Sequence, residues 1–64
     1  MLVNDLFLAC DDWVAYTLVN IFDLDKDEVH PFVGDGCLFK YGSYHVKGFT
    51  VDPAADTINL RVER

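Results

Sequence analysis

The segment Ile21–His30, with the sequence Ile-Phe-Asp-Leu-Asp-Lys-Asp-Glu-Val-His, constrains the fold of this chain most strongly. It places four acidic residues and one lysine between two apolar runs rich in β-branched and aromatic residues, Trp13–Phe22 and Val29–Val33. Two such runs around a polar segment of hairpin-loop length predict strand, turn and strand. Because Pro31 cannot donate a hydrogen bond to a sheet ladder, the second run is predicted to be an edge strand or a short one.

The first run carries apolar side chains on both of its alternating faces. This pattern is typical of a central strand that is covered on each side. A continuing helix is the rival interpretation for residues 11–20, and the β-branched and aromatic content favours the strand.

Residues 3–12 predict a short N-terminal helix. Asn4 or Asp5 is expected to cap its first turn. Two acids at the negative end of the helix dipole are unfavourable, so Asp11 and Asp12 are expected to end it. Its apolar positions fall on one face at i, i+3 and i+4 spacing, namely Leu6, Ala9 and Cys10.

The second half of the chain predicts another hairpin. Gly34-Asp35-Gly36 is a predicted loop. Residues 37–43 form either a short strand or a single helical turn that ends at Gly42 as its C′ residue. Residues 44–51 predict a strand with a bulge at Gly48. That bulge is expected to let three apolar residues face inward, namely Val46, Phe49 and Val51.

A turn and a regular strand complete the chain. Pro53 is pre-set for a turn over residues 52–56. Residues 57–63 alternate, with three apolar residues predicted to point inward: Ile58, Leu60 and Val62. The 64 residues then predict one α+β domain, a short N-terminal helix packed on a four-stranded, mainly antiparallel sheet of two hairpins.

The net charge of −6 is unevenly distributed along the chain. Residues 1–35 hold eight acidic residues against one lysine, whereas residues 36–64 hold three acids against four bases. An acidic first half argues against direct binding of nucleic acid, because Lys and Arg must supply affinity for phosphates. It suits docking on a protein partner with a basic surface, and it also fits an acidity that only keeps a small protein soluble.

Two candidate metal sites fail on their spacing. Asp23, Asp25 and Asp27 match the first three acidic positions of a calcium-binding EF-hand loop, but Glu28 and Gly34 stand where that loop needs Gly and Glu. The four ligands of a zinc site would be Cys10, His30, Cys37 and His45, and they lack the closely spaced pair that structural zinc sites contain. No metal or cofactor is therefore predicted, although a metal-binding protein remains a further alternative.

Catalysis is not predicted either. Cys37, His45 and Asp35 are the residue types of a nucleophilic site. No helix N-terminus is evident near Cys37 to lower the thiol pKa, and a domain of this size has little room for a substrate pocket.

The predicted location is the cytoplasm. The N-terminus lacks the basic segment of a signal peptide, and no apolar run approaches the roughly 20 residues of a membrane span. Cys10 and Cys37 are then expected to be reduced thiols, although the sequence leaves open whether they pair.

Protein interaction is the remaining function class, because the chain combines acidic charge, surplus aromatic residues and an edge strand. The leading hypothesis is a non-enzymatic module whose carboxylates dock on a basic partner and take the place of phosphates. The candidate partner-binding residues are Asp11, Asp12, Asp23, Asp25, Asp27, Glu28 and Asp35. The alternative is a homodimer held by an edge strand and exposed aromatic side chains, with a structural role only.

Three segments carry a resemblance: residues 6–13, which end in Cys10-Asp11-Asp12-Trp13, then Ile21–Val29, then Tyr44–Asp52. With them the chain resembles small acidic proteins of bacterial phages and mobile elements. That group includes inhibitors of host defence nucleases, such as anti-CRISPR proteins. The resemblance implies such a setting for the interaction hypothesis, with the host cytoplasm as the location if the chain is phage-encoded. It implies no catalytic residues.

Overall fold

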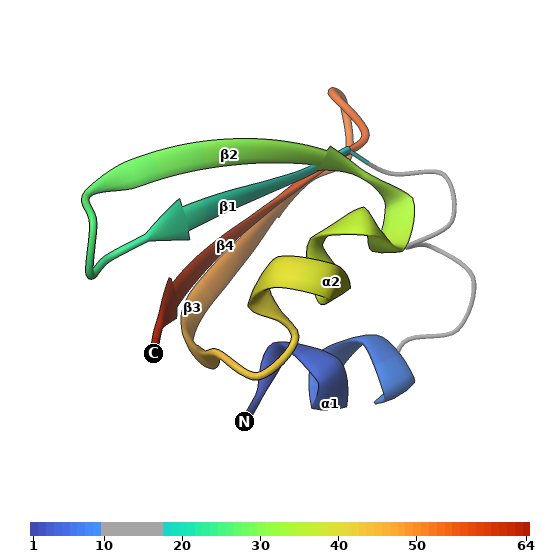
Figure 1. The fold of residues 1–64 in the computed structure, drawn as a ribbon. Coiled ribbons are helices and arrows are strands. Elements are labelled where there is room, and N and C mark those ends of the chain that lie inside the picture. Colours follow the sequence, from blue (N-terminus) through green and yellow to red (C-terminus); the bar gives the residue numbers. More distant parts are fainter. Residues whose placement is uncertain (10–17) are drawn as a thin grey trace.

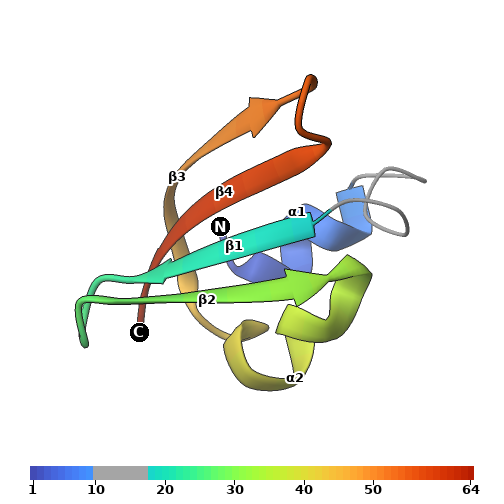
Figure 2. The ribbon, with the colours of Figure 1, turned by 90° about the horizontal axis from the view of Figure 1, so that it is seen from above.

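The architecture is one four-stranded sheet with helices on a single side. The computed structural model describes residues 1–9 and 18–64. The elements are, in order, α1 (Val3–Ala9), β1 (Leu18–Asp23), β2 (Glu28–Val33), the 3-10 helix η2 (Gly34–Cys37), α2 (Leu38–Tyr41), β3 (His45–Asp52) and β4 (Thr57–Glu63). The strand order is β2-β1-β4-β3. Figure 1 shows the sheet as a curved layer above both helices, and Figure 2 shows the strands from above.

Both predicted hairpins form. β1 pairs with β2 in antiparallel fashion, so that Asp23 lies opposite Glu28, and β3 pairs likewise with β4. β2 lies at an edge of the sheet, as Pro31 predicted. β1 lies between β2 and β4, and its residues Val19 and Ile21 are fully buried. Residues 13–17 of the predicted first strand lie outside the described residues.

The sheet is mixed, which corrects the expectation of a mainly antiparallel one. β1 and β4 are parallel, with Ile21 beside Leu60 at the centre of the sheet. The reason lies in the segment 34–44, which crosses from the end of β2 to the start of β3 and carries η2 and α2. This crossover lets the chain cover one sheet face, and it makes β2 and β3 run in the same direction. Their hairpin partners β1 and β4 must then be parallel to each other.

The core lies between the sheet and the helical segments. Strands β1 and β4 contribute Val19, Ile21, Ile58, Leu60 and Val62 to one cluster of buried residues. The crossover adds Cys37 and Tyr41 to it, and α1 adds Val3, Leu6 and Phe7. Tyr41 is the largest fully buried side chain among the described residues.

The N-terminal helix forms, but its capping differs from the expectation. It begins at Val3, so Asn4 and Asp5 lie inside its first turn. The Asp5 carboxylate instead reaches back and accepts a hydrogen bond from the Leu2 backbone N–H at 3.1 Å, as the acidic residue of a capping box does. Ala9 is exposed, contrary to its predicted place on the buried face, and Cys10 lies outside the described residues.

The connection after β2 is helical from its start. The predicted loop at Gly34-Asp35-Gly36 is the 3-10 helix η2, and residues 38–41 form a helical turn rather than a strand. Gly42 follows that turn with φ −56°, so it is not the left-handed C′ residue expected from the sequence. Its lack of a side chain has a steric reason: a Cβ there would lie 2.6 Å from both Asn4 Oδ1 and Leu38 O.

The bulge in β3 forms where it was predicted, since the register shifts between Val46 and Gly48. Val46 packs against the core. Phe49 and Val51 lie opposite the buried Leu60 and Ile58, yet they are 51% and 56% exposed. Their side chains thus share the face of the core residues but are not covered by them, which corrects the expectation that they are interior.

Candidate functional site

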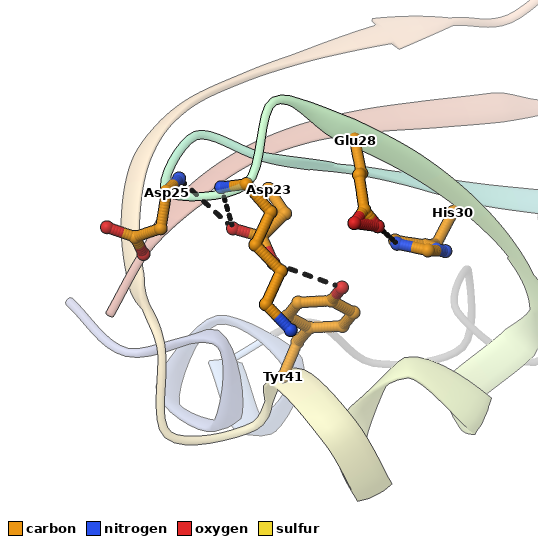
Figure 3. A network of polar contacts seen from close by, with 6 residues as sticks. Asp23, Asp25, Glu28, His30 and Tyr41 are labelled. Atoms are coloured by element: carbon orange, nitrogen blue, oxygen red, sulfur yellow. Dashed lines mark hydrogen bonds and ion pairs between the residues drawn. The ribbon is translucent and has the colours of Figure 1, made fainter.

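The β1–β2 turn is organised by a buried carboxylate. Asp23, the last residue of β1, is 1% exposed. Its Oδ1 accepts hydrogen bonds from the backbone N–H groups of Asp25 at 3.1 Å and Lys26 at 3.3 Å. Its Oδ2 accepts a hydrogen bond from the Tyr41 hydroxyl at 3.3 Å (Figure 3). A buried carboxylate needs several donors to offset its lost hydration, and the turn and α2 supply them.

Tyr41 links this network to the core. It is fully buried, and its ring contacts Tyr44, with 4.8 Å between the ring centroids. The rings of His30 and Phe32 in β2 lie 6.0 Å from it by centroid. Burial, assisted by the negative charge of Asp23, raises the pKa of Tyr41 to about 12. The hydroxyl therefore stays protonated near neutral pH and donates to the carboxylate.

Further backbone contacts hold the turn in place. The Leu24 N–H donates to Val62 O at 2.9 Å, and the Arg64 N–H donates to Asp25 Oδ2 at 2.7 Å. Asp27 adopts φ 54°, a left-handed conformation that Asp tolerates better than most residues. The turn is thus tied both to the end of β4 and to the buried Asp23.

Three exposed acidic residues remain on this turn, and we name Asp25, Asp27 and Glu28 the acidic tip. The Glu28 carboxylate lies 3.1 Å from His30 Nε2 (Figure 3). Lys26 lies among them and is also exposed. Each carboxylate has two oxygens with several acceptor positions, so the internal contacts of Asp25 and Glu28 leave capacity for further donors.

The seven candidate partner-binding residues do not form one surface. Asp25, Asp27 and Glu28 lie together at the acidic tip, whereas Asp23 is buried and engaged by three donors. Asp35 belongs to η2, which follows the end of β2 that lies away from the β1–β2 turn. Asp11 and Asp12 lie outside the described residues. The structure therefore brings together three of the seven at the surface.

Two exposed acids at the other end of the sheet were not among the candidates. Asp52 and Asp56 flank the β3–β4 turn, and the Leu18 N–H donates to Asp56 O at 3.2 Å. Asp56 has φ 52°, and Asp52 Oδ1 accepts from the Ala55 N–H at 3.3 Å. Both hairpin turns thus repeat the pattern Asp-x-x-x-Asp, with a capping first Asp and a left-handed second one. That spacing was visible in the sequence and indicates the turn type.

The metal ligands considered from the sequence do not converge. Cys37 is a buried free thiol, and burial, assisted by Asp35, raises its pKa to about 11. His30 contacts Glu28, His45 is exposed and lies on β3, and Cys10 lies outside the described residues. Within residues 1–9 and 18–64, no group of three His, Cys, Asp or Glu side chains is placed to hold a metal ion.

Comparisons with protein-family models, curated proteins and solved structures found no match for this chain. None of the helices in the described part of the chain has the length and apolar character needed to cross a membrane.

Proposed function

We propose that this chain is a non-enzymatic interaction module that docks its acidic tip on a basic surface of a protein partner. The observation that carries the proposal is the buried Asp23 carboxylate, which binds the backbone of the turn from which the three exposed acids project. A rigid turn loses little conformational freedom on binding, so more of the charge attraction contributes to affinity. The tip therefore acts as a preformed carboxylate cluster for Arg and Lys side chains.

The contact is local rather than a mimic of a whole nucleic-acid strand. Broad mimicry needs carboxylates spread along one face, and the exposed acids described in the strands and their connections are divided between the two ends of the sheet. Three carboxylates on one turn match a single phosphate-binding cluster of a basic protein. Such a contact contributes orientation and a faster encounter more than a large interface area.

The resemblance to acidic proteins of phages and mobile elements adds a specific form of the proposal. In that form the partner is a host nuclease, and the acidic tip occupies part of its basic nucleic-acid-binding surface. The chain then inhibits by exclusion and needs no catalytic residue of its own.

The test is a pull-down from a bacterial lysate at low and high salt with the wild type and two matched variants. D25N/D27N neutralises the tip, and D35N/D56N removes the same number of charges at the other end of the sheet. Asn retains the oxygen that accepts the Arg64 N–H at position 25, and it also tolerates the left-handed conformation at positions 27 and 56. We expect capture of a basic protein that weakens with salt and is lost in D25N/D27N only.

The outcome separates a local contact from a general effect of charge. Equal losses in both variants would show that only the net charge matters, and capture that does not depend on salt would overturn docking by charge. For the nuclease form, the captured protein should lose binding of labelled DNA or RNA when the wild-type chain is added. Simultaneous binding of both would refute exclusion.

A further inference from the structure

Among the described residues, the outer edge of β3 is open along most of its length. β3 is the last strand in the sheet order, and only its first residues meet the N-terminus. There Leu2 forms a bridge with His45, and the Val46 N–H donates to Met1 O at 2.8 Å. Beyond Val46, no described strand pairs with this edge. Residues 48–51 carry no charge and no proline, so they lack the usual features that block pairing at an edge.

This edge also exposes apolar side chains on the face that the core occupies. Phe49 and Val51 lie opposite Leu60 and Ile58, which are 0% and 1% exposed. They are themselves more than half exposed, because β3 has a neighbouring strand on one side only. A strand added to β3 would extend this apolar face and cover both residues.

We propose that the added strand is β3 of a second copy of this chain. In an antiparallel pair with two-fold symmetry about Thr50, Thr50 lies opposite Thr50 of the second copy, and Phe49 lies opposite Val51 of the second copy. Opposite residues point to the same face of a sheet, so Phe49 of each copy covers Val51 of the other. The pair therefore contains two equivalent Phe49–Val51 contacts. The contact is self-complementary, which a two-fold interface requires.

Charge complementarity favours the same register. The bulge places Lys47 and Gly48 together beside Arg61, and Lys47 Nζ lies 3.6 Å from Glu63 Oε1. In the two-fold pair, Asp52 of the second copy falls opposite Gly48 and therefore next to Lys47. The symmetry creates this opposite-charge contact at both ends. A foreign strand would have to reproduce both the apolar alternation and the two charges.

The first test compares two lysine substitutions of nearly equally exposed valines on the two edge strands. Val51 on β3 is 56% exposed and Val29 on β2 is 54% exposed. At about 1 mM chain, a dissociation constant of about 1 mM leaves roughly half of the chains in dimers. We expect sedimentation equilibrium at that concentration to show a mass above the 7.3 kDa of one chain for the wild type and V29K. V51K should have the mass of a single chain.

The second test uses a charge exchange between the copies. K47E alone places Glu beside Asp52 of the second copy, and D52K alone places Lys beside Lys47. Each substitution should therefore raise the dissociation constant of the dimer about tenfold or more. Mixed in equal amounts, the two variants form a pair with opposite charges at both ends, and association should return.

A single-chain mass for the wild type at about 1 mM would overturn the proposal. So would loss of association in V29K with retention in V51K, because that result places the contact on β2. A mixture of K47E and D52K that stays dissociated while the wild type associates would overturn the register. Circular dichroism of every variant verifies that the fold is retained.

Discussion

The Tyr41 hydroxyl donates a hydrogen bond to Asp23 Oδ2 at 3.3 Å, and both side chains are fully buried or nearly so. The contact joins the crossover helix α2 to the last residue of β1, eighteen positions earlier in the chain. Among the described residues, no buried side-chain nitrogen or oxygen lacks a hydrogen-bond partner. This pair therefore links the conformation of the β1–β2 turn to the packing of the core.

Y41F should destabilise the fold through this link. The substitution retains the ring contacts with Tyr44, His30 and Phe32 and removes only the hydroxyl. Asp23 Oδ2 then loses its donor in a buried site, which costs about 1–3 kcal/mol of unfolding free energy. Denaturant titration followed by circular dichroism measures the loss. Y44F is the control, since Tyr44 is only partly buried, and an equal loss in both variants would contradict the specific role of the Tyr41 hydroxyl.

The two hairpin turns allow a matched comparison of their capping residues. Asp23 is buried and accepts three hydrogen bonds, whereas Asp52 is exposed and accepts one from Ala55 at 3.3 Å. D23A leaves the buried Tyr41 hydroxyl and two partly buried backbone N–H groups without their acceptor and should cost about 3 kcal/mol or more, while D52A should cost about 1 kcal/mol or less. D23N retains one acceptor oxygen and should fall between them. Equal unfolding free energies for D23A and D52A would show that the buried network contributes nothing beyond the turn itself.

The sequence predicted the local elements better than their assembly. The alternation in residues 57–63 identified the strand β4, and the proline in β2 identified an edge strand. Both signals can be read from a few neighbouring residues. The parallel contact of β1 and β4 was not predictable in this way, since it follows from the direction in which residues 34–44 cross the sheet. Phe49 and Val51 were placed on the right face, but their exposure depends on where the sheet ends.

The acidic turn shows the same division. Its position between two strands followed from the pattern of apolar and polar residues. The different roles of its acids did not, because alternation alone does not show that Asp23 is buried against Tyr41 while Asp25 and Asp27 face solvent. An Asp at the first position of a turn does indicate a capping role for its side chain. That signal was present at both Asp23 and Asp52, although capping was predicted for neither.

Stability should fall in alkali, because two buried groups favour their protonated forms. Burial raises the pKa of Cys37 from 9.0 to about 11 and that of Tyr41 from 10.0 to about 12. Below pH 9 both groups are protonated in the folded and unfolded states, so their contribution is constant. As pH rises towards 11 and 12, the unfolded state loses protons that the folded state retains, and each group contributes a loss of about 2–3 kcal/mol.

Denaturant titrations between pH 8 and pH 12 measure this fall, and Y41F isolates the contribution of one group. The variant lacks an ionisable hydroxyl, so its stability should decline less than that of the wild type between pH 10 and pH 12. The difference between the two proteins should accordingly shrink as pH rises through that range. A difference that stays constant from pH 8 to pH 12 would contradict the assignment of this loss to Tyr41.

Gly42 and Gly36 provide a steric test of how α1 and the crossover fit together. A Cβ at Gly42 would lie 2.6 Å from Leu38 O, a backbone atom, and 2.6 Å from Asn4 Oδ1 in α1. The Asn4 N–H also donates to Gly42 O at 2.9 Å, so the two segments have little room to separate. G42A should therefore destabilise the fold by about 1–3 kcal/mol, as overpacking does.

At Gly36 the nearest atom, Phe32 Cδ1, lies 3.8 Å away, and G36A should change the unfolding free energy by less than about 0.5 kcal/mol. Thermal and denaturant unfolding of both variants measures the contrast, and a G42A protein as stable as G36A would mean that α1 shifts freely against the crossover.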